Sequence, residues 1–399
     1  MTAPLVLMLS AAHPPDDLRV VRKEGAALAA AGWRVRHLAP GDGLAAAPIA
    51  GVAIETYPRR RGWAGRLLGI PALARRAAAS GGAVLHASEP DAWAAALLAA
   101  HCPPWGSPWR CGARVVLDVH EHYPSRLDPH LPRWLRPPAA LLLRLACRGA
   151  AAAADAVVVA KDGLAEDFAA PGRTIAVRNY ALPSHALPVA LAPHRHRPGP
   201  LLLAHTGALG RSRGWPQMLA ALALAPPGTR LRLIGRFTDG SEPAFIAQAA
   251  SLGLADRIER LDWRPHAEAL ALLAEADIAL VLFQPGAVNH RLALPHKLFD
   301  AMLAGLPVIA PAFATEVAAI IRDAGCGELV EATDAAAIAA AIARLADPAR
   351  RAALGAAGRL AAETRYGWAG EAARLVALYR QLVPLSNGTA DSQAGPGGL

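Results

Sequence analysis

Short, continuous runs of apolar residues recur along this chain, and stretches with helical periodicity separate them. The first half contains PLVLMLSAA, RVRHLAP, GAVLHAS, ARVVLDVHE and DAVVVAK. The second half contains PLLLAHTG, RLRLIGRF, IERLDW, DIALVLFQ, LPVIAP and GELVE. Strands that are apolar throughout are typical of parallel sheets that helices cover on both faces. The sequence therefore predicts an α/β fold built from two doubly wound, Rossmann-like domains.

A segment rich in proline and histidine, LPSHALPVALAPHRHRPGP, divides the two series. It has no periodicity, and we interpret it as a linker. Its histidines could bind a metal, but their spacing is not that of metal ligands, so a solvated linker is favoured. The expected segments are a first domain at 1–185, the linker at 186–199, a second domain at 200–365, a terminal helix at 366–383 that packs back toward the first domain, and a disordered tail at 384–399. Ligands of such sheets lie beyond the carboxyl ends of the strands, so we expect the site in a central cleft that both domains face.

The chain of 399 residues carries a formal charge of +9, and its pI is near 10.0. This balance is compatible with nucleic acid, an anionic membrane or an anionic small substrate. No basic run is interleaved with aromatic residues and no zinc-finger pattern occurs, so we expect no nucleic-acid partner. The four cysteines lack CxxC spacing, which favours free thiols in a reducing cytoplasm and no metal site.

Two segments combine arginines with apolar residues: 57–76 (YPRRRGWAGRLLGIPALARR) and, more weakly, 132–148 (PRWLRPPAALLLRLACR). Such a composition suits an anionic membrane surface, and equally a solvated helix with a packed underside. No stretch of 18 apolar residues is free of charge, so we expect no membrane span. The expected location is the cytoplasm, with peripheral contact with the inner face of the plasma membrane as an alternative.

A glycine-rich loop follows the first strand of the second series, in LLLAHTGALGRSRGWPQMLAAL. Gly207 and Gly214 would let the backbone approach an anion, and the amides at the start of the next helix favour phosphate. Arg211 and Arg213 add fixed positive charge. The alternative is an ordinary strand–helix turn with surface arginines. The GxGxxG fingerprint of dinucleotide sites is absent.

A polar loop and a short helix fill FQPGAVNHRLALPHKLFDAMLAGLPVIAP, residues 283–311. Pro295 begins the predicted helix and Gly305 ends it. Lys297 and Asp300 are three residues apart and share one helix face. They could form an intrahelical ion pair; alternatively, the lysine holds a phosphate and the carboxylate a ribose hydroxyl pair.

Ionisable residues also crowd the end of a first-half strand, in DVHEHYPSR. Asp118, His120, Glu121 and His122 alternate there, so one pair points inward or toward the cleft. A hydrogen-bonded core histidine and a surface position are the alternatives. No D-x-D triplet occurs anywhere, so arginine and lysine would have to neutralise a diphosphate without a metal.

Over residues 4–382 the chain resembles the GT-B fold glycosyltransferases of family 4, also called group 1. The resemblance rests on DDLRVVRKEGAALAAAGWRV, DVHE, TGALGRSRG, PHKLFDAMLAGLPVIAP and YGWAGEAARLVALYRQL. It implies that the second domain binds a nucleotide-diphosphate sugar and the first domain binds the acceptor. It also implies retention of anomeric configuration without a metal. No cofactor is expected beyond the donor itself, and the acceptor is a carbohydrate or a lipid-linked molecule.

The resemblance implies roles for individual residues. Asp300 matches the second acidic residue of an E-x7-E motif and would hold the ribose, and Lys297 matches a lysine of relatives with a P-x-K form. Arg213 would contact the diphosphate, and His120 would lie near the transferred sugar. The candidate catalytic residues are His120, Arg213 and Lys297; the candidate substrate-binding residues are Gly207, Arg211, Gly214, Asp300, Asp118, Glu121 and His296; no metal ligand is predicted.

Three departures from the family pattern bear on activity. Leu292 stands where the first glutamate of the motif is usual, Ala208 stands where many relatives have arginine, and Asp17-Leu18 replaces a glycine pair. The sequence therefore predicts a glycosyltransferase in glycan, glycolipid or polysaccharide biosynthesis, with two alternatives. These are a non-catalytic nucleotide-sugar-binding subunit and a nucleotide-sugar epimerase on the same fold.

Overall fold

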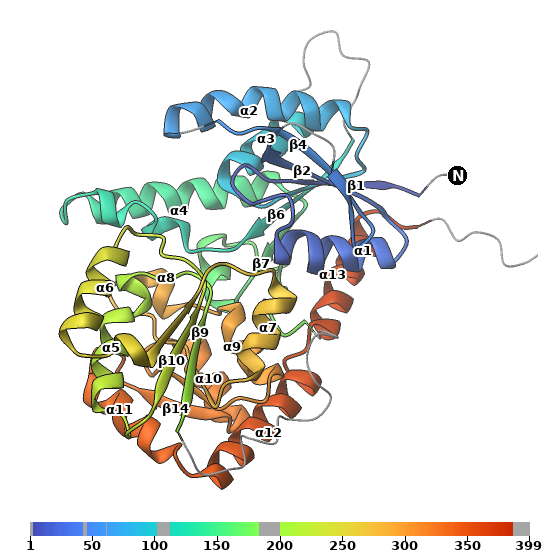
Figure 1. Cartoon of the computed structure of the whole chain (residues 1–399). Helices are drawn as coiled ribbons and strands as arrows, with labels where there is room; N and C mark the ends of the chain where they lie inside the picture. Colours follow the sequence, from blue (N-terminus) through green and yellow to red (C-terminus); the bar gives the residue numbers. More distant parts are fainter. Residues whose placement is uncertain (1–2, 43–45, 61, 102–111, 183–199, 386–399) are drawn as a thin grey trace, which may run out of the picture. The chain divides into compact units, whose positions relative to one another are not determined.

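A computed structural model describes residues 3–42, 46–60, 62–101, 112–182 and 200–385 (Figure 1). The predicted linker, Cys102, Cys111 and most of the predicted tail lie outside these residues. The chain divides into two compact units: unit 1 is Met1–Arg178 with Ala369–Leu399, and unit 2 is Asn179–Trp368. Each unit holds one sheet and is described by itself.

Unit 1 contains an eight-stranded sheet in the order β3-β4-β2-β1-β5-β6-β7-β8. Its strands are β1 (Leu5–Leu9), β2 (Arg34–Gly41), β3 (Ala46–Ile49), β4 (Val52–Pro58), β5 (Val84–Ala87), β6 (Arg114–Val119), β7 (Ala156–Val159) and β8 (Thr174–Ala176). Neighbouring strands are parallel except β3, which runs antiparallel to β4. The buried strand β1 lies between β2 and β5, so the strand order reverses direction there.

The helices of unit 1 follow its strands. They are a π-helical segment (Leu18–Gly25) that continues into α1 (Ala26–Ala30), α2 (Gly62–Ala79), α3 (Pro90–His101), α4 (Arg136–Ala153) and α13 (Trp368–Leu382), whose first residue belongs to unit 2. Asp17 caps the first of them, because its side chain accepts hydrogen bonds from the backbone N–H groups of Arg19 and Val20 at 2.9 Å. Among the described residues, none of the helices is both long and apolar enough to cross a membrane.

Unit 2 contains a six-stranded, wholly parallel sheet in the order β11-β10-β9-β12-β13-β14. Its strands are β9 (Leu202–Thr206), β10 (Arg230–Ile234), β11 (Ile258–Leu261), β12 (Ile278–Leu280), β13 (Val308–Pro311) and β14 (Gly327–Val330). Its helices are α5 (Trp215–Leu224), α6 (Glu242–Ser251), α7 (His266–Ala274), α8 (Val288–Arg291), α9 (His296–Leu303), α10 (Thr315–Ala324), α11 (Ala335–Arg344) and α12 (Pro348–Thr364). The order reverses between β9 and β12, and two apolar clusters fill the space between the sheet and its helices.

The predicted α/β class is confirmed: both units are sheets of mainly parallel strands accompanied by helices. The pattern of apolar runs missed β3, β4 and β8. Strand β4 alternates buried and more exposed residues, the residues of β8 are only partly buried, and β3 and β8 are the edge strands of the sheet. The segment 57–76 also begins differently from a simple helix. Its first residues end strand β4 at Pro58, and α2 starts only at Gly62.

Candidate active site

The glycine-rich loop of unit 2 lies at the carboxyl end of β9, where the strand order reverses. Gly207 and Gly214 have positive φ angles of 88° and 83°, a region that side chains other than glycine rarely adopt. A Cβ on Gly214 would stand 1.9 Å from the carbonyl oxygen of Leu282, which follows β12. Glycine therefore brings the start of α5 against the neighbouring strand. Reversal points of this kind are where α/β sheets bind ligands.

Lys297 reaches the same point from the first turn of α9. A Cβ on Gly207 would lie 3.7 Å from Lys297 Nζ, so the amine sits beside the loop backbone. Lys297 Nζ donates to Nε2 of the buried His205, 3.0 Å away, because His205 Nδ1 donates to the carbonyl of Leu280 at 2.9 Å. Burial, together with the positive charge of Arg213, lowers the pKa of Lys297 to about 7.

The two arginines of the loop differ in position. Arg213 lies close enough to Lys297 for its charge to oppose protonation of the amine. Arg211 lies above the ring of Trp215, with its guanidinium carbon 5.1 Å from the ring centroid, and its backbone N–H donates to Asp239 at 2.7 Å. The loop thus gathers positive charge at the amino end of α5, an arrangement that favours a bound phosphate.

Asp300 and His296 lie on the same helix as Lys297. Asp300 Oδ1 is 3.1 Å from His266 Nε2, at the start of α7. Among the described residues no ion pair joins Asp300 to Lys297, so the alternative of an intrahelical pair is not what the helix forms. His296 Nε2 lies 2.6 Å from Asn179 Nδ2. Leu292 closes the short helix α8 and donates its N–H to Val288.

In unit 1, His120 follows β6 and contacts Asp118, the buried residue two positions before it. The ring of His13 stands edge-on to that of His120, with centroids 4.7 Å apart. Glu89, after β5, accepts hydrogen bonds from the N–H groups of residues 11–13 at 2.8 to 3.0 Å. Burial alone would lower the pKa of His13, but a hydrogen bond to Asp17 and the charge of Glu89 raise it to about 9. These residues meet where the order of the sheet reverses, between β1 and β5.

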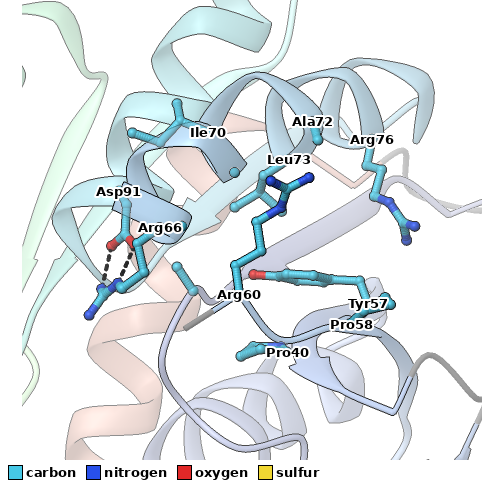
Figure 2. A pocket seen from close by; sticks show the side chains of 13 residues that line it. Pro40, Tyr57, Pro58, Arg60, Arg66, Ile70, Ala72, Leu73, Arg76 and Asp91 are labelled. Atoms are coloured by element: carbon cyan, nitrogen blue, oxygen red, sulfur yellow. Dashed lines mark hydrogen bonds and ion pairs between the residues drawn. The ribbon is translucent and has the colours of Figure 1, made fainter. Parts of the chain in front are cut away.

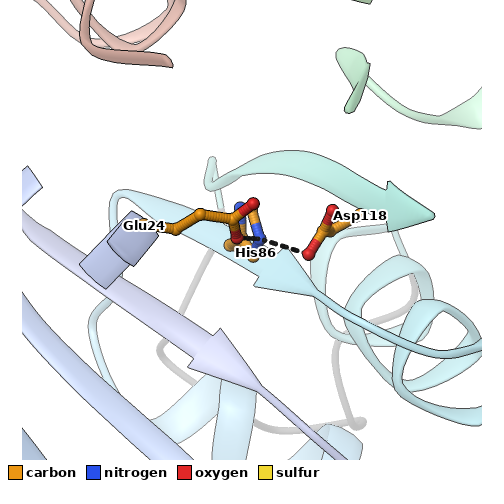
Figure 3. Close-up of side chains that lie close together, drawn as sticks. All are labelled: Glu24, His86 and Asp118. Carbon is orange, nitrogen blue, oxygen red and sulfur yellow. Dashed lines mark ion pairs between the residues drawn. The ribbon is translucent and has the colours of Figure 1, made fainter. Parts of the chain in front are cut away.

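A fully buried group of charged side chains supports Asp118. Figure 3 shows it together with Glu24 and His86, whose ligand atoms lie within 4.8 Å of one another. A divalent ion would suit this set by residue type, but the guanidinium of Arg19 already neutralises both carboxylates, at 2.7 Å from Glu24 and 3.0 Å from Asp118. Desolvation would raise the pKa of Asp118, and Arg19 and His120 nevertheless hold it well below its usual range.

His86 links this group to the terminal helix. Its Nδ1 lies 2.7 Å from the hydroxyl of Tyr379 in α13, and its Nε2 faces Glu24 and Asp118 at 3.3 and 3.5 Å. Burial opposes charging of His86, but the two carboxylates raise its pKa to about 9. The chain thus holds Asp118 in a fixed, charged state beside His120.

The structure separates the remaining candidates of the first half. Glu121 is partly exposed and pairs with Arg126, while His122 contacts Ser125 and Asp167. Sequence reasoning named Asp118 and His120 and gave weaker weight to a second strand-end cluster, HASEPD (residues 86–91), which contains His86 and Glu89. It missed His13. HASEPD begins in the last two residues of β5 and resembles DVHE in placing ionisable residues at a strand end.

Comparison with known proteins matches both units. The family model for glycosyl transferases group 1 matches residues 201–347, and the model for glycosyltransferase family 4 matches residues 19–177. Sucrose-phosphate synthase from Thermosynechococcus elongatus is 22% identical, with a TM-score of 0.71 over 95% of this chain and 99% of that one. Comparison with curated proteins gives no match.

Two further solved structures share the fold. HepE of Anabaena, solved in complex with UDP, is 16% identical, with a TM-score of 0.67 over 96% of this chain and 100% of that one. WaaG, a glycosyltransferase of lipopolysaccharide biosynthesis, is 18% identical, with a TM-score of 0.62 over 93% and 99% of the two chains. The fold is that of the GT-B glycosyltransferases, and the predicted enzyme class is confirmed. This chain belongs to the group 1 glycosyltransferases, glycosyltransferase family 4.

Proposed function

We propose that this glycosyltransferase moves a sugar from a nucleoside-diphosphate sugar to an acceptor hydroxyl, in glycan, glycolipid or polysaccharide biosynthesis. The observation that carries the proposal is the juxtaposition of Lys297 and Arg213 at the reversal point of the unit 2 sheet. Within the described residues Lys297 has no carboxylate partner, and the charge of Arg213 disfavours its protonation. An anion at this place would relieve the repulsion, and the diphosphate of a nucleotide sugar is an anion of that kind.

The proposed chemistry places the leaving diphosphate against Arg213, Lys297 and the amino end of α5. These positive groups stabilise the charge that develops as the bond from the sugar to the diphosphate breaks. The sugar passes through an oxocarbenium-like state, and the anomeric configuration is retained. Because fixed cations neutralise the diphosphate, the reaction is proposed to need no metal. Asp300 would hold the ribose. Gly207, Arg211 and Gly214 would line the site of the phosphates, and His296 would contact the donor from the first residue of α9.

Unit 1 would supply the acceptor side. His120 is partly exposed, and Asp118 fixes the orientation of its ring from behind, so its free face can contact the transferred sugar. Asp118 acts as a positioning residue, since it is fully buried and cannot itself touch a substrate. Glu121, which pairs with Arg126, would lie at the margin of the acceptor site.

Peripheral contact of unit 1 with an anionic membrane is proposed for a lipid-linked acceptor, from the cytoplasmic side. Helix α2 exposes Leu67 and Leu68, with exposed fractions of 60% and 69%, beside the arginines of the same helix. Helix α4 exposes Leu141, Leu142 and Leu145. Exposed leucines flanked by arginine suit an interface of anionic headgroups and acyl chains.

The test is a calorimetric and thermal-shift screen of the full chain against UDP, GDP, ADP and TDP and their sugars, with and without EDTA. A nucleotide at 100 times its Kd should add about 2.7 kcal/mol of stability. We expect one nucleoside diphosphate to bind whether or not EDTA is present, and its sugar to be transferred to one of a panel of acceptors. Binding without turnover over that panel would favour a non-catalytic subunit. The leucine at position 292, in place of the usual glutamate, would be the first explanation to test. Acceptor-free conversion of the donor would favour an epimerase, and no binding would overturn the proposal.

A further inference from the structure

A pocket of about 190 Å³ opens in unit 1 at the carboxyl ends of β1, β2 and β4, under helix α2 (Figure 2). Its polar lining comes from four cationic or phenolic side chains and one carboxylate. These residues are Tyr57, Arg60, Arg66, Arg76 and Asp91. Three guanidinium groups thus line a pocket that contains a single acidic side chain.

The three arginines are not equally neutralised. Arg66 is paired with Asp91 through two hydrogen bonds of 2.7 Å each, so the single carboxylate of the pocket already neutralises Arg66. Arg76 lies 3.7 Å from Glu55 in an exposed pair and stands over the ring of Tyr57, 5.9 Å from its centroid. Arg60 has no hydrogen bond or ion pair with any residue that the structure describes. The pocket therefore keeps uncompensated positive charge.

The exposed residue Arg60 passes close to helix α2. Its side chain runs along two glycines one turn apart in α2. A Cβ on Gly65 would lie 3.3 Å from Arg60 Cβ, and a Cβ on Gly69 would lie 3.4 Å from Arg60 Cδ. A larger residue at either glycine would crowd the arginine. Figure 2 shows Arg60 between the end of β4 and α2, close to Tyr57.

The pocket adjoins the site around His120. Ala11, which lines the pocket, donates its backbone N–H to Glu89, as do the next two residues of the loop. The last of them is His13, whose ring contacts that of His120. Tyr57 donates its hydroxyl to the carbonyl of Ser10 at 2.7 Å, which fixes the wall of the pocket to the same loop. A molecule anchored in the pocket would extend along this loop toward His120.

We propose that the pocket binds a phosphate group of the acceptor, so that the enzyme glycosylates a phosphorylated molecule. The inference rests on the proposed function, because it assigns the pocket to the acceptor. Arginines approach the pocket from the β4–α2 turn and from the helix, and their several N–H donors match the oxygens of a phosphate. The phosphate could belong to a soluble sugar phosphate or to a lipid headgroup, since Leu67 and Leu68 are exposed on the same helix.

The test compares Arg60→Ala with Arg75→Ala in the full chain. Arg75 is exposed on α2 and does not line the pocket, so its removal changes the net charge equally. Calorimetry measures the binding of glucose 6-phosphate, with glucose as the unphosphorylated control and malonate as a control anion. The measurements are made with saturating UDP and repeated in Arg213→Ala protein, so that binding at the diphosphate site is excluded. Sedimentation with phosphatidylcholine vesicles, with and without phosphatidic acid, tests the lipid source.

We expect Arg60→Ala to weaken binding of glucose 6-phosphate or of phosphatidic-acid vesicles at least about ten-fold, because a charge-assisted hydrogen bond is lost. The arm that responds identifies the source, and Arg75→Ala should leave it unchanged. Equal effects of the two substitutions, or binding of glucose or malonate as tight as that of glucose 6-phosphate, would overturn the inference, as would no binding in either arm. UDP binding to the unaltered protein is measured as a separate test. If UDP does not bind, the proposed function is wrong. If UDP binds but phosphate binding does not depend on Arg60, only the assignment of the pocket to an acceptor phosphate is wrong.

Discussion

Lys297 Nζ lies 3.0 Å from Nε2 of His205, a buried histidine that donates its other ring N–H to Leu280. Burial, with the neighbouring Lys297 charge, lowers the pKa of His205 to about 3, so the ring is a neutral acceptor. Burial and Arg213 lower the pKa of Lys297 to about 7. The amine is therefore only partly charged at neutral pH until an anion arrives.

Binding of a nucleoside diphosphate should therefore take up a proton at Lys297. The anion raises the pKa of the amine back toward its ordinary value of 10.5, so free and bound proteins differ in protonation above pH 7. Below pH 7 the amine is already charged and no uptake follows. We expect affinity for UDP to fall as pH rises from 7 to 9, by up to about ten-fold per unit for one proton. Calorimetry at pH 8 in buffers of different ionisation enthalpy measures the uptake.

Lys297→Arg is the matched control, because a guanidinium stays charged throughout this range. The variant should bind UDP without net proton uptake at pH 8, apart from any proton taken up or released by the phosphates of UDP. Binding of UDP itself to Lys297→Ala, which lacks the amine, measures that contribution. Equal uptake by the unaltered protein and Lys297→Arg would mean that Lys297 does not titrate near pH 7.

Asp300 should matter for the nucleoside and not for the diphosphate. Its carboxylate faces His266, and the proposed ribose contact would replace or share that hydrogen bond. We expect Asp300→Ala to weaken UDP binding about ten-fold and to leave pyrophosphate binding unchanged. Arg213→Ala should weaken both ligands. If Asp300→Ala weakened pyrophosphate as strongly as UDP, the carboxylate would act on the charge of the site and not on a ribose.

The sequence was sufficient for features that depend on neighbouring residues. Apolar runs located most strands, because a strand covered on both faces must be apolar throughout. Alternation predicted one inward pair in DVHEHYPSR, and Asp118 and His120 are the residues that meet. Helical spacing placed Lys297 and Asp300 on one face. It could not tell that they contact different partners, because those partners come from β9 and α7.

The supporting contacts depend on residues far apart in sequence. Tyr379 and His86 are separated by 293 positions, and no local pattern joins them. Glu89 accepts hydrogen bonds from a loop 76 to 78 residues away. Tertiary packing determines which residues form such pairs. A single sequence can show that a residue is polar and lies near a strand end or on a helix, but it does not show which residue is its partner.

The hydroxyl of Tyr379 should stabilise the charged form of His86. With a pKa of about 9, His86 is an imidazolium at neutral pH, and its Nδ1–H donates to Tyr379. Tyr379→Phe keeps the ring and leaves a buried donor without a partner, which should cost about 1–3 kcal/mol in the free energy of unfolding. NMR titration should show the pKa of His86 falling. Stability that depends on this charge is present below pH 6.5 and lost as pH rises toward 9, so the variant should lose most at low pH.

Tyr366→Phe is the matched control for that change, since Tyr366 donates its hydroxyl to Asp323 at the exposed surface. Urea unfolding should show a loss below about 1 kcal/mol for this variant. If Tyr379→Phe also lost less than about 1 kcal/mol in the free energy of unfolding and left the pKa of His86 unchanged, the hydroxyl of Tyr379 would not stabilise the charged His86.

Gly214→Ala should disrupt the donor site through a backbone clash. The added Cβ would stand 1.9 Å from the carbonyl oxygen of Leu282 and would also force a side chain into a φ of 83°. Gly240→Ala isolates the second effect, because Gly240 has a φ of 72° with nothing within 4 Å of its Cβ position. The φ strain alone should cost about 1–2 kcal/mol, which urea unfolding measures for Gly240→Ala. We expect Gly214→Ala to lose clearly more stability and to lose UDP binding, because the amino end of α5 must move away from β12. Equal losses in the two variants, with UDP binding retained, would show that the close approach of Gly214 to Leu282 does not shape the site.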